Sequence, residues 1–238
     1  MKTPSRQSIR SGSSGRPAFL FDLDGTLVDS VYQHVLAWRE ALEAIDIKLA
    51  VWRIHRRIGM SGGLFINALV RETGHRLEKG QAEQAQRVHH ESYARLVSQV
   101  RPLPGARELL DHLSAARIPW AIATSGRMES ARLALQILGV DPQKASVVTR
   151  DKVKYAKPDP DLFLAAAAML GTEIGKSIVV GDSVWDLLAA RRAGALGVGF
   201  LSGGYGQDEL ERAGAYRVYQ DPADLLWHLD EVGARIDE

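Results

Sequence analysis

The feature that most constrains the fold is a set of short runs, rich in apolar residues, that alternate with segments of helical periodicity. The runs cover residues 18–21, 118–123, 146–149, 177–180 and 196–200. The helical segments cover residues 109–113, 128–138, 159–170 and 185–193. A strand that is apolar along its length must be covered on both faces, which is typical of parallel strands joined by helices. The sequence therefore predicts an α/β fold, a Rossmann-like parallel sheet with helices on both faces.

A block of helical character interrupts this alternation after the first run. Apolar residues recur at helical spacing over residues 31–45 and 64–72, and a polar helix is expected over residues 81–100. The proline- and glycine-marked residues 101–105 lead back to the alternating pattern. The expected parts are therefore a flexible tail at residues 1–16, a core domain of residues 17–30 and 101–238, and an inserted helical domain of residues 31–100.

The composition excludes several classes of function. The 238 residues carry 30 basic and 29 acidic side chains, a net charge of +1, so binding to nucleic acid is not expected. No apolar run reaches the roughly 20 residues that span a bilayer, so no membrane association is expected. The absence of cysteine excludes disulfides, thiolate metal sites and cysteine nucleophiles, and it favours a cytoplasmic protein. The tail has no apolar segment of the kind found in secretory signals.

Polar side chains follow four of the predicted strands. They are Asp22, Asp24 and Thr26 after the first strand, Thr124 and Ser125 after the second, Lys157 after the third, and Asp182 and Asp186 after the fourth. Each set alone is common in a turn or a helix cap. The carboxyl ends of parallel strands, however, meet at one edge of the sheet, where ligands bind. Four such sets at one edge indicate a functional site.

The residue types in this set point to phosphoryl transfer. Crowded carboxylates repel one another and take up protons unless a cation neutralises them. Oxygen ligands without histidine or cysteine suit Mg²⁺. Beside such an ion, a lysine and a hydroxyl can hold phosphoryl oxygens while one carboxylate attacks phosphorus and forms an aspartyl phosphate. Mg²⁺ is therefore the expected cofactor.

The order and spacing of these motifs resemble the haloacid dehalogenase superfamily, most of whose members are phosphatases. Residues 22–30, 121–124, 157–158 and 181–186 are similar to its four motifs in turn. The helical insertion is similar to the α-helical cap of the subclass that includes phosphoglycolate phosphatases and β-phosphoglucomutases. The resemblance extends from residue 18 to the C-terminal region.

The resemblance implies catalytic roles for four residues. Asp22 would attack phosphorus, and Asp24 would protonate the leaving oxygen and then activate water. Thr124 and Lys157 would hold the phosphoryl group.

The resemblance also implies a Mg²⁺ site. Asp22, the backbone carbonyl of Asp24 and Asp182 would bind the ion, with Asp186 as a further acidic group beside it.

Substrate specificity is expected to lie in the cap. Substrate contacts are expected from Ser125 of the core and from His34, Arg56, Gly59 and Ser61 of the cap. Residues 59–63 resemble a cap loop that faces the substrate in relatives, and His34 is similar to an early cap-helix residue of sugar phosphatases. For His34, packing within the helix is an equally good explanation. An arginine that commonly grips a second phosphate in mutases is replaced by Gly62.

Two further features receive a structural interpretation. His89 and His90 are adjacent and point in different directions, so they are interpreted as part of a solvated helix face. The glycine-rich residues 203–206 could lie near the site, but a flexible connection explains them equally well.

The predicted function is a Mg²⁺-dependent phosphatase that acts on a small phosphorylated metabolite, a sugar phosphate or a similar phosphomonoester. A phosphomutase is the main alternative, and Gly62 argues against it. A 2-haloacid dehalogenase would leave Asp24 and the acidic fourth motif without a task. A non-catalytic phosphate-binding protein would be expected to lack one of the four motif residues, and all of them are present.

Overall fold

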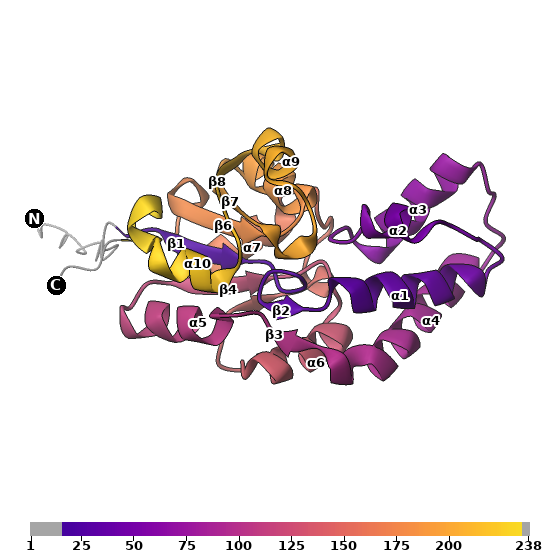
Figure 1. The fold of residues 1–238 in the computed structure, drawn as a ribbon, viewed down its shortest axis with the longest axis horizontal. Coiled ribbons are helices and arrows are strands. Elements are labelled where there is room, and N and C mark those ends of the chain that lie inside the picture. The colour runs from indigo at the N-terminus through magenta and orange to yellow at the C-terminus, as the bar shows by residue number, and fades with distance from the viewer. Residues whose placement is uncertain (1–15, 235–238) are drawn as a thin grey trace, which may run out of the picture.

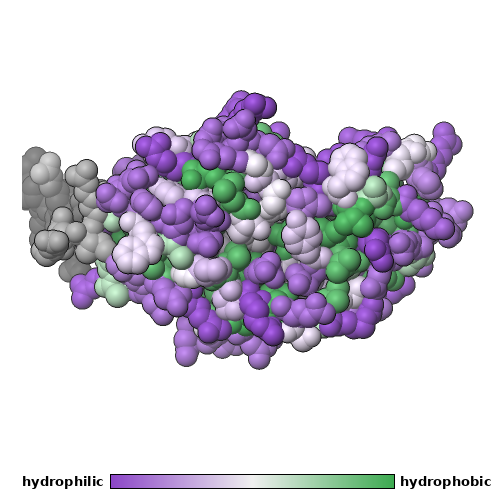
Figure 2. Space-filling view, in the orientation of Figure 1, coloured by the Kyte–Doolittle hydropathy of each residue, from purple (hydrophilic) through white to green (hydrophobic). Residues whose placement is uncertain are grey.

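The computed structural model describes residues 16–234 and shows a core built on a sheet, with a helical cap beside it (Figure 1). The flexible tail expected at residues 1–16 lies outside the described residues except for Arg16. Within the described part of the chain, no helix is long and apolar enough to cross a membrane. Figure 2 shows a mostly hydrophilic face, with hydrophobic patches over both the core and the cap.

The core contains a six-stranded sheet in which every neighbouring pair is parallel. In order across the sheet, the strands are β5 (Val147–Val148), β4 (Trp120–Ala123), β1 (Ala18–Phe21), β6 (Ser177–Gly181), β7 (Leu196–Phe200) and β8 (Ala215–Tyr219). The predicted parallel sheet is confirmed. Because β1 lies in the middle, between β4 and β6, the residue that follows it is surrounded by the ends of its neighbours.

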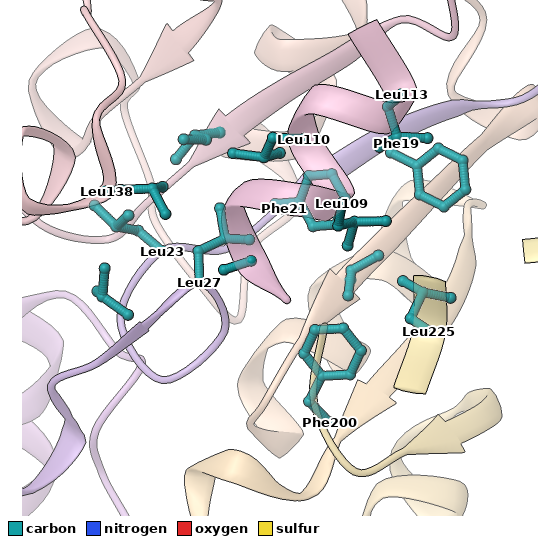
Figure 3. Close-up of a cluster of buried hydrophobic side chains, with 14 of the residues drawn as sticks. Phe19, Phe21, Leu23, Leu27, Leu109, Leu110, Leu113, Leu138, Phe200 and Leu225 are labelled. Atoms are coloured by element: carbon teal, nitrogen blue, oxygen red, sulfur yellow. The ribbon is translucent and has the colours of Figure 1, made fainter. Parts of the chain in front are cut away.

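Helices cover both faces of the sheet, as predicted. Phe19 and Phe21 of β1 point into one hydrophobic cluster (Figure 3). Leu20 between them points into another cluster on the opposite face. The first cluster contains residues of α5 (Ala106–Ala115), α6 (Met128–Leu138) and α10 (Pro222–Trp227), and the second contains residues of α7 (Asp161–Leu170) and α8 (Val184–Ala193). This alternation is the period of two that a strand imposes on its side chains.

The C-terminal elements of the core, including β8 and α9, could not be predicted from runs of apolar residues in the sequence. β8 lies at the edge of the sheet, and its residues Tyr216 and Arg217 are exposed, so it lacks the continuous apolar run of the inner strands. The short helix α9 (Gln207–Ala213) packs beside α8 and β8. Short 3-10 turns cover Val97–Gln99, Arg150–Lys152, Ile174–Lys176, Leu201–Gly203 and Leu229–Val232.

The cap consists of helices with a hydrophobic cluster of their own. They are α1 (Val31–Glu43), α2 (Val51–His55), α3 (Gly62–Thr73) and α4 (Gln81–Leu96). Trp38 of α1 and Phe65 of α3 are buried in this cluster, with stacked rings whose centroids are 4.2 Å apart. The chain enters and leaves the cap through two antiparallel segments, β2 (Val28–Asp29) and β3 (Arg101–Pro102).

The packing of α7 allows a matched test of the core. Leu162 is fully buried between the helix and the sheet, whereas Leu164 of the same helix is 41% exposed. We expect Leu162→Ala to lower the free energy of unfolding by about 2–5 kcal/mol, because it leaves a cavity. Leu164→Ala should change it by less than about 1 kcal/mol. Urea denaturation measures both, and equal losses would contradict the assigned faces of α7.

Candidate active site

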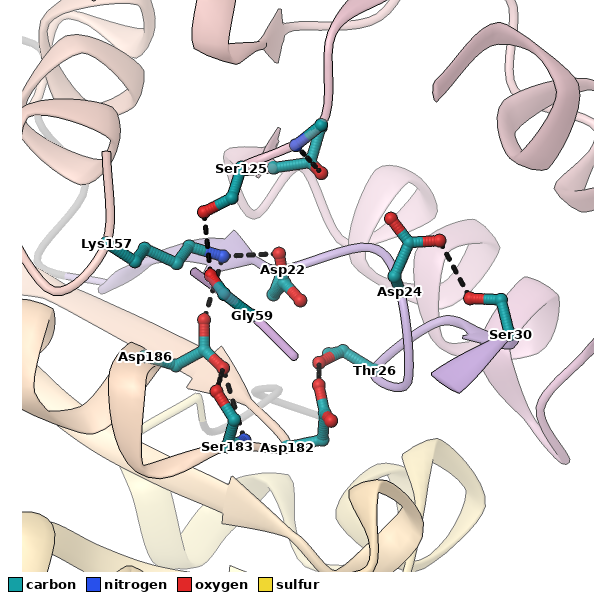
Figure 4. A network of polar contacts seen from close by, with 12 residues as sticks. Asp22, Asp24, Thr26, Ser30, Gly59, Ser125, Lys157, Asp182, Ser183 and Asp186 are labelled. Atoms are coloured by element: carbon teal, nitrogen blue, oxygen red, sulfur yellow. Dashed lines mark hydrogen bonds and ion pairs between the residues drawn. The ribbon is translucent and has the colours of Figure 1, made fainter. Parts of the chain in front are cut away.

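The carboxyl ends of the central strands bring the predicted polar residues together (Figure 4). Asp22 follows β1, Thr124 follows β4 and Asp182 follows β6, and all three side chains are buried. Lys157 reaches the same place from the loop between β5 and α7, and Asp186 from the first turn of α8. The site thus forms where the sheet topology predicts it.

A fully buried ammonium group lies at the centre of this site. Lys157 Nζ forms ion pairs with Asp22 and, at 2.8 Å, with Oδ1 of Asp186. The ring of Phe163 covers it, with Nζ 5.0 Å from the ring centroid. Burial acts to lower the pKa of Lys157, but the charges of Asp186 and Asp22 outweigh burial and raise it. Lys157 is therefore charged in the folded protein.

Asp186 is held by groups on both of its oxygens. Oδ1 faces Lys157, and Oδ2 accepts hydrogen bonds from the backbone N–H of Ser183 at 3.1 Å and from its hydroxyl at 2.5 Å. The bond from the Ser183 backbone N–H to Asp186 belongs to a capping box at the start of α8. Both oxygens of Asp186 therefore have partners in the folded protein, Lys157 on one side and Ser183 on the other.

The carboxylates outnumber the cation that accompanies them. Burial raises the pKa of Asp22 to about 7 despite the charge of Lys157. Burial, followed by the charges of Asp186 and Asp22, raises the pKa of Asp182 well above its usual range, and Thr26 donates a hydrogen bond of 2.7 Å to its Oδ1. Oxygens from Asp22, Asp182 and Asp186 lie within 4.8 Å of one another. This oxygen-only set fits a hard divalent cation, which would relieve the repulsion.

Asp24 lies in a different environment from Asp22. Its Oδ1 accepts a hydrogen bond of 2.7 Å from Ser30 and lies 3.2 Å from Nε2 of His34. Burial acts to raise the pKa of Asp24, but His34 and the hydrogen bond from Ser30 outweigh burial and lower it. The carboxylate therefore points toward the base of the cap and lies outside the cluster formed by the other acids.

A cavity of about 760 Å³ lies between the core and the cap, above Asp22 and Asp24. Of the residues predicted to contact substrate, it is lined by Ser125, His34, Gly59 and Ser61. The hydroxyl of Ser125 donates a hydrogen bond of 2.8 Å to the carbonyl of Gly59, which joins core and cap at the cavity wall.

Arg56, which the sequence predicts to contact substrate, has its guanidinium engaged by other groups in this structure. Its guanidinium is bound by both oxygens of Glu209 and lies 4.2 Å from the centroid of the Tyr205 ring, and Arg56 is not among the residues that line the cavity. Glu209 is far away in the sequence, so no local pattern could reveal this partner. The neighbouring Arg57 does line the cavity, where Glu72 holds its guanidinium.

The solvated face expected for His89 is wrong, although His89 and His90 do point in different directions. The ring of His89 stacks on Trp38, with centroids 4.2 Å apart, and its Nε2 lies 3.2 Å from Nδ1 of His34. Burial, followed by the charges of His34 and His90, holds the pKa of His89 well below its usual range. The spacing of four residues from the buried Tyr93 could have indicated this face.

Sequence comparison connects this geometry with known proteins. Residues 17–194 match the family described as haloacid dehalogenase-like hydrolases. The chain belongs to this family. The resemblance predicted from the four motifs is therefore confirmed, and the protein is a hydrolase.

Individual relatives cover most of the chain. A crystal structure of a hydrolase from Pseudomonas syringae is 57% identical, covers 91% of this chain and 99% of its own, and superimposes with a TM-score of 0.90. Hexitol phosphatase A of Escherichia coli (strain K12) is 37% identical over 74% of this chain and 79% of its own. The β-phosphoglucomutase of Bacillus subtilis (strain 168) is 31% identical over 89% of this chain and 92% of its own.

The raised pKa of Asp22 predicts a pH-dependent stability in the absence of divalent metal. The folded protein binds this proton more tightly than the unfolded chain, whose pKa is near 3.8. The resulting stabilisation is present below about pH 4 and is lost as the pH rises through about 7. In Asp22→Asn this side chain stays neutral at every pH. Between about pH 4 and pH 7, the free energy of unfolding of the variant should therefore fall by roughly 4 kcal/mol less than that of the wild type. Urea denaturation with EDTA at several pH values measures this.

The matched control for the pH experiment is Asp29→Asn. Asp29 belongs to the same motif, but its side chain is exposed in β2. This variant should follow the wild-type stability curve. Parallel curves for wild type and Asp22→Asn would contradict the environment assigned to Asp22.

Proposed function

We propose that the protein is a Mg²⁺-dependent phosphatase that hydrolyses a small phosphorylated metabolite, a sugar phosphate or a similar phosphomonoester, through an aspartyl-phosphate intermediate. The observation that carries the proposal is the buried Asp22, paired with Lys157 at the floor of a cavity that the cap closes. The Escherichia coli relative named hexitol phosphatase A supports the substrate class.

The residues that would hold Mg²⁺ are Asp22, Asp182 and the backbone carbonyl of Asp24. The raised pKa values of Asp22 and Asp182 support this assignment, because a divalent cation stabilises the ionised form of both groups. When bound, the ion offsets the negative charge of the phosphoryl group. Asp186 lies in the same cluster, and its contacts favour the task of keeping Lys157 in place.

The chain's own residues account for the two chemical steps. A carboxylate oxygen of Asp22 forms a bond to phosphorus while the bond to the leaving oxygen breaks, and Asp24 gives that oxygen a proton. A water molecule then attacks phosphorus, Asp24 takes its proton, and phosphate leaves as the Asp22 carboxylate is restored. Lys157 and the hydroxyl of Thr124 hold the phosphoryl oxygens throughout.

The position of Asp24 supports its double role. Asp24 is ionised in the free protein because Ser30 and His34 stabilise its charge. A phosphate dianion that enters the cavity raises the pKa of this carboxyl group by repulsion, which favours the protonated form needed in the first step. Transfer of this proton to the leaving oxygen in the first step restores the carboxylate of Asp24, which can then take a proton from the attacking water.

The cap would recognise the leaving group. Besides Ser125, His34, Gly59 and Ser61, the cavity is lined by polar and basic residues of cap and core. They include Arg57, Asn67, Gln86, Arg87 and Lys154. This lining suits a hydroxylated, anionic molecule.

The first prediction of the proposal concerns the nucleophile. Asp22→Asn should lower phosphate release to the background rate, because an amide neither attacks phosphorus nor binds the cation well. The measurement is phosphate release from a panel of phosphorylated sugars, polyols and small acids, with Mg²⁺ and with EDTA. The exposed Asp29→Asn should retain the wild-type rate. Turnover by Asp22→Asn at the wild-type rate would refute the mechanism.

The same panel separates a phosphatase from a phosphomutase. The Bacillus subtilis relative favours the second possibility, whereas Gly62, which lines the cavity, offers no side chain to grip a second phosphate. For a phosphatase, ³¹P NMR should show inorganic phosphate as the product. Conversion of a sugar phosphate into its isomer without phosphate release would indicate a mutase.

The second prediction concerns the acid and base. Asp24→Asn should lower kcat by about 10²- to 10⁴-fold, because proton transfer is lost at both steps. The loss in kcat/KM, which reports only the steps up to departure of the leaving group, should be smaller for p-nitrophenyl phosphate, because its weakly basic leaving group needs no proton to depart. Equal losses in kcat/KM for both kinds of substrate would contradict the role of Asp24 as the acid.

A further inference from the structure

The glycine-rich segment of residues 202–206 lies between the cap and the predicted metal site. It follows β7 and includes the end of the 3-10 turn Leu201–Gly203. Its sequence alone is compatible with a flexible connection. In the structure, however, Gly203 is buried and the segment contacts three other parts of the chain.

The first contact is with Asp182. A Cβ atom added to Gly203 would lie 2.1 Å from Oδ2 and 2.6 Å from the backbone oxygen of Asp182, so only a glycine fits there. The other carboxylate oxygen, Oδ1, accepts the hydrogen bond from Thr26. The carboxylate of Asp182 is therefore confined between Gly203 and the loop that carries Thr26.

The second contact joins the segment to that same loop. The hydroxyl of Ser202 donates a hydrogen bond of 2.6 Å to the carbonyl of Gly25. Because Gly25 immediately precedes Thr26, the two walls beside Asp182 are tied to each other. The carboxylate is thus fixed before any cation binds.

The third contact comes from the cap. Nε2 of His55, at the end of α2, donates a hydrogen bond of 2.8 Å to the carbonyl of Gly203. The His55 ring is stacked on Tyr32 of α1 with centroids 5.5 Å apart, which orients it. A Cβ atom on Gly204 would lie 3.1 Å from His55 Nε2, so this second glycine lets the ring approach the backbone.

We propose that residues 202–204 are a positioning element through which His55 of the cap fixes the carboxylate of Asp182, so that cation affinity in the core depends on contact with the cap. The inference rests on the metal site of the proposed function and adds His55 and Gly203 as residues that determine its affinity. A ligand held in place before binding loses less conformational freedom when the ion arrives. Separation of cap and core removes the hydrogen bond from His55 and frees the wall beside Asp182.

The first test measures the dissociation constant of Mg²⁺ by calorimetry, on the full chain and without substrate. Gly203→Ala should weaken binding by more than about tenfold, because the new methyl group displaces Asp182. Gly206→Ala is the matched control, since its Cβ would lie no closer than 3.7 Å to Glu209 and its backbone is extended. Gly206→Ala should bind Mg²⁺ as the wild type does.

The second test leaves the segment itself intact. His55→Phe keeps a ring against Tyr32 but removes the donor, and it should weaken Mg²⁺ binding by roughly three- to tenfold, the value of one hydrogen bond. His55→Gln restores a donor and should recover most of the affinity, which a purely structural role of the ring would not allow. His75→Gln, at an exposed position of the cap, should have no effect.

The outcomes separate this inference from the proposed function. Wild-type affinity in His55→Phe, or equal losses in His55→Phe and His55→Gln, overturns the positioning role while the phosphatase proposal stands. A wild-type protein that binds no Mg²⁺ and hydrolyses phosphate esters equally well in EDTA overturns the metal site and this inference together. Loss in His55→Phe with recovery in His55→Gln supports the inference even if Gly203→Ala does not fold.

Discussion

The buried ion pairs of Lys157 are the interaction on which the site depends. Three carboxylates converge at the carboxyl ends of β1 and β6 and at the start of α8, and their mutual repulsion opposes folding. Lys157 offsets part of this repulsion through its ion pairs with Asp22 and Asp186. Removal of one member of a buried ion pair is strongly destabilising, because the other charge is left without a partner. Asp186, held by Ser183, keeps the ammonium beside Asp22. The remaining excess of negative charge is what makes the same place suited to a cation.

The two acids of the first motif show how the fold separates chemical roles over a short stretch of chain. Asp22 ends the central strand and faces the lysine and the other acids, whereas Asp24 faces Ser30 and His34 at the base of the cap. Burial is shared, but the neighbours differ, so the pKa values shift in opposite directions. One group can therefore serve as nucleophile and the other in proton transfer.

The inner strands and the core acids could be predicted because each is indicated by a short stretch of neighbouring residues in the sequence. A strand buried on both faces, such as β1 or β6, is a continuous apolar run, and the polar residues that follow must meet at one edge. The edge strand β8 has exposed residues and no such run. Arg56 meets Glu209 only because the cap approaches the core, and His89 meets Trp38 only because α4 packs on α1. The sequence around each residue does not identify these partners.

The junction of cap and core has a consequence for how such a protein can change. β2 and β3 pair as the two arms of a ladder, with Val28 level with Pro102, so the insertion leaves the core and returns to it at adjacent points. For the core, the whole cap is equivalent to the loop of a hairpin. Its helices can be lengthened, shortened or exchanged at little cost in chain entropy while the sheet keeps its connections. Changes in the cap can thus reshape the cavity wall without changing the order of the strands that Asp22, Thr124 and Asp182 follow, provided that contacts such as those of His34 and His55 are kept.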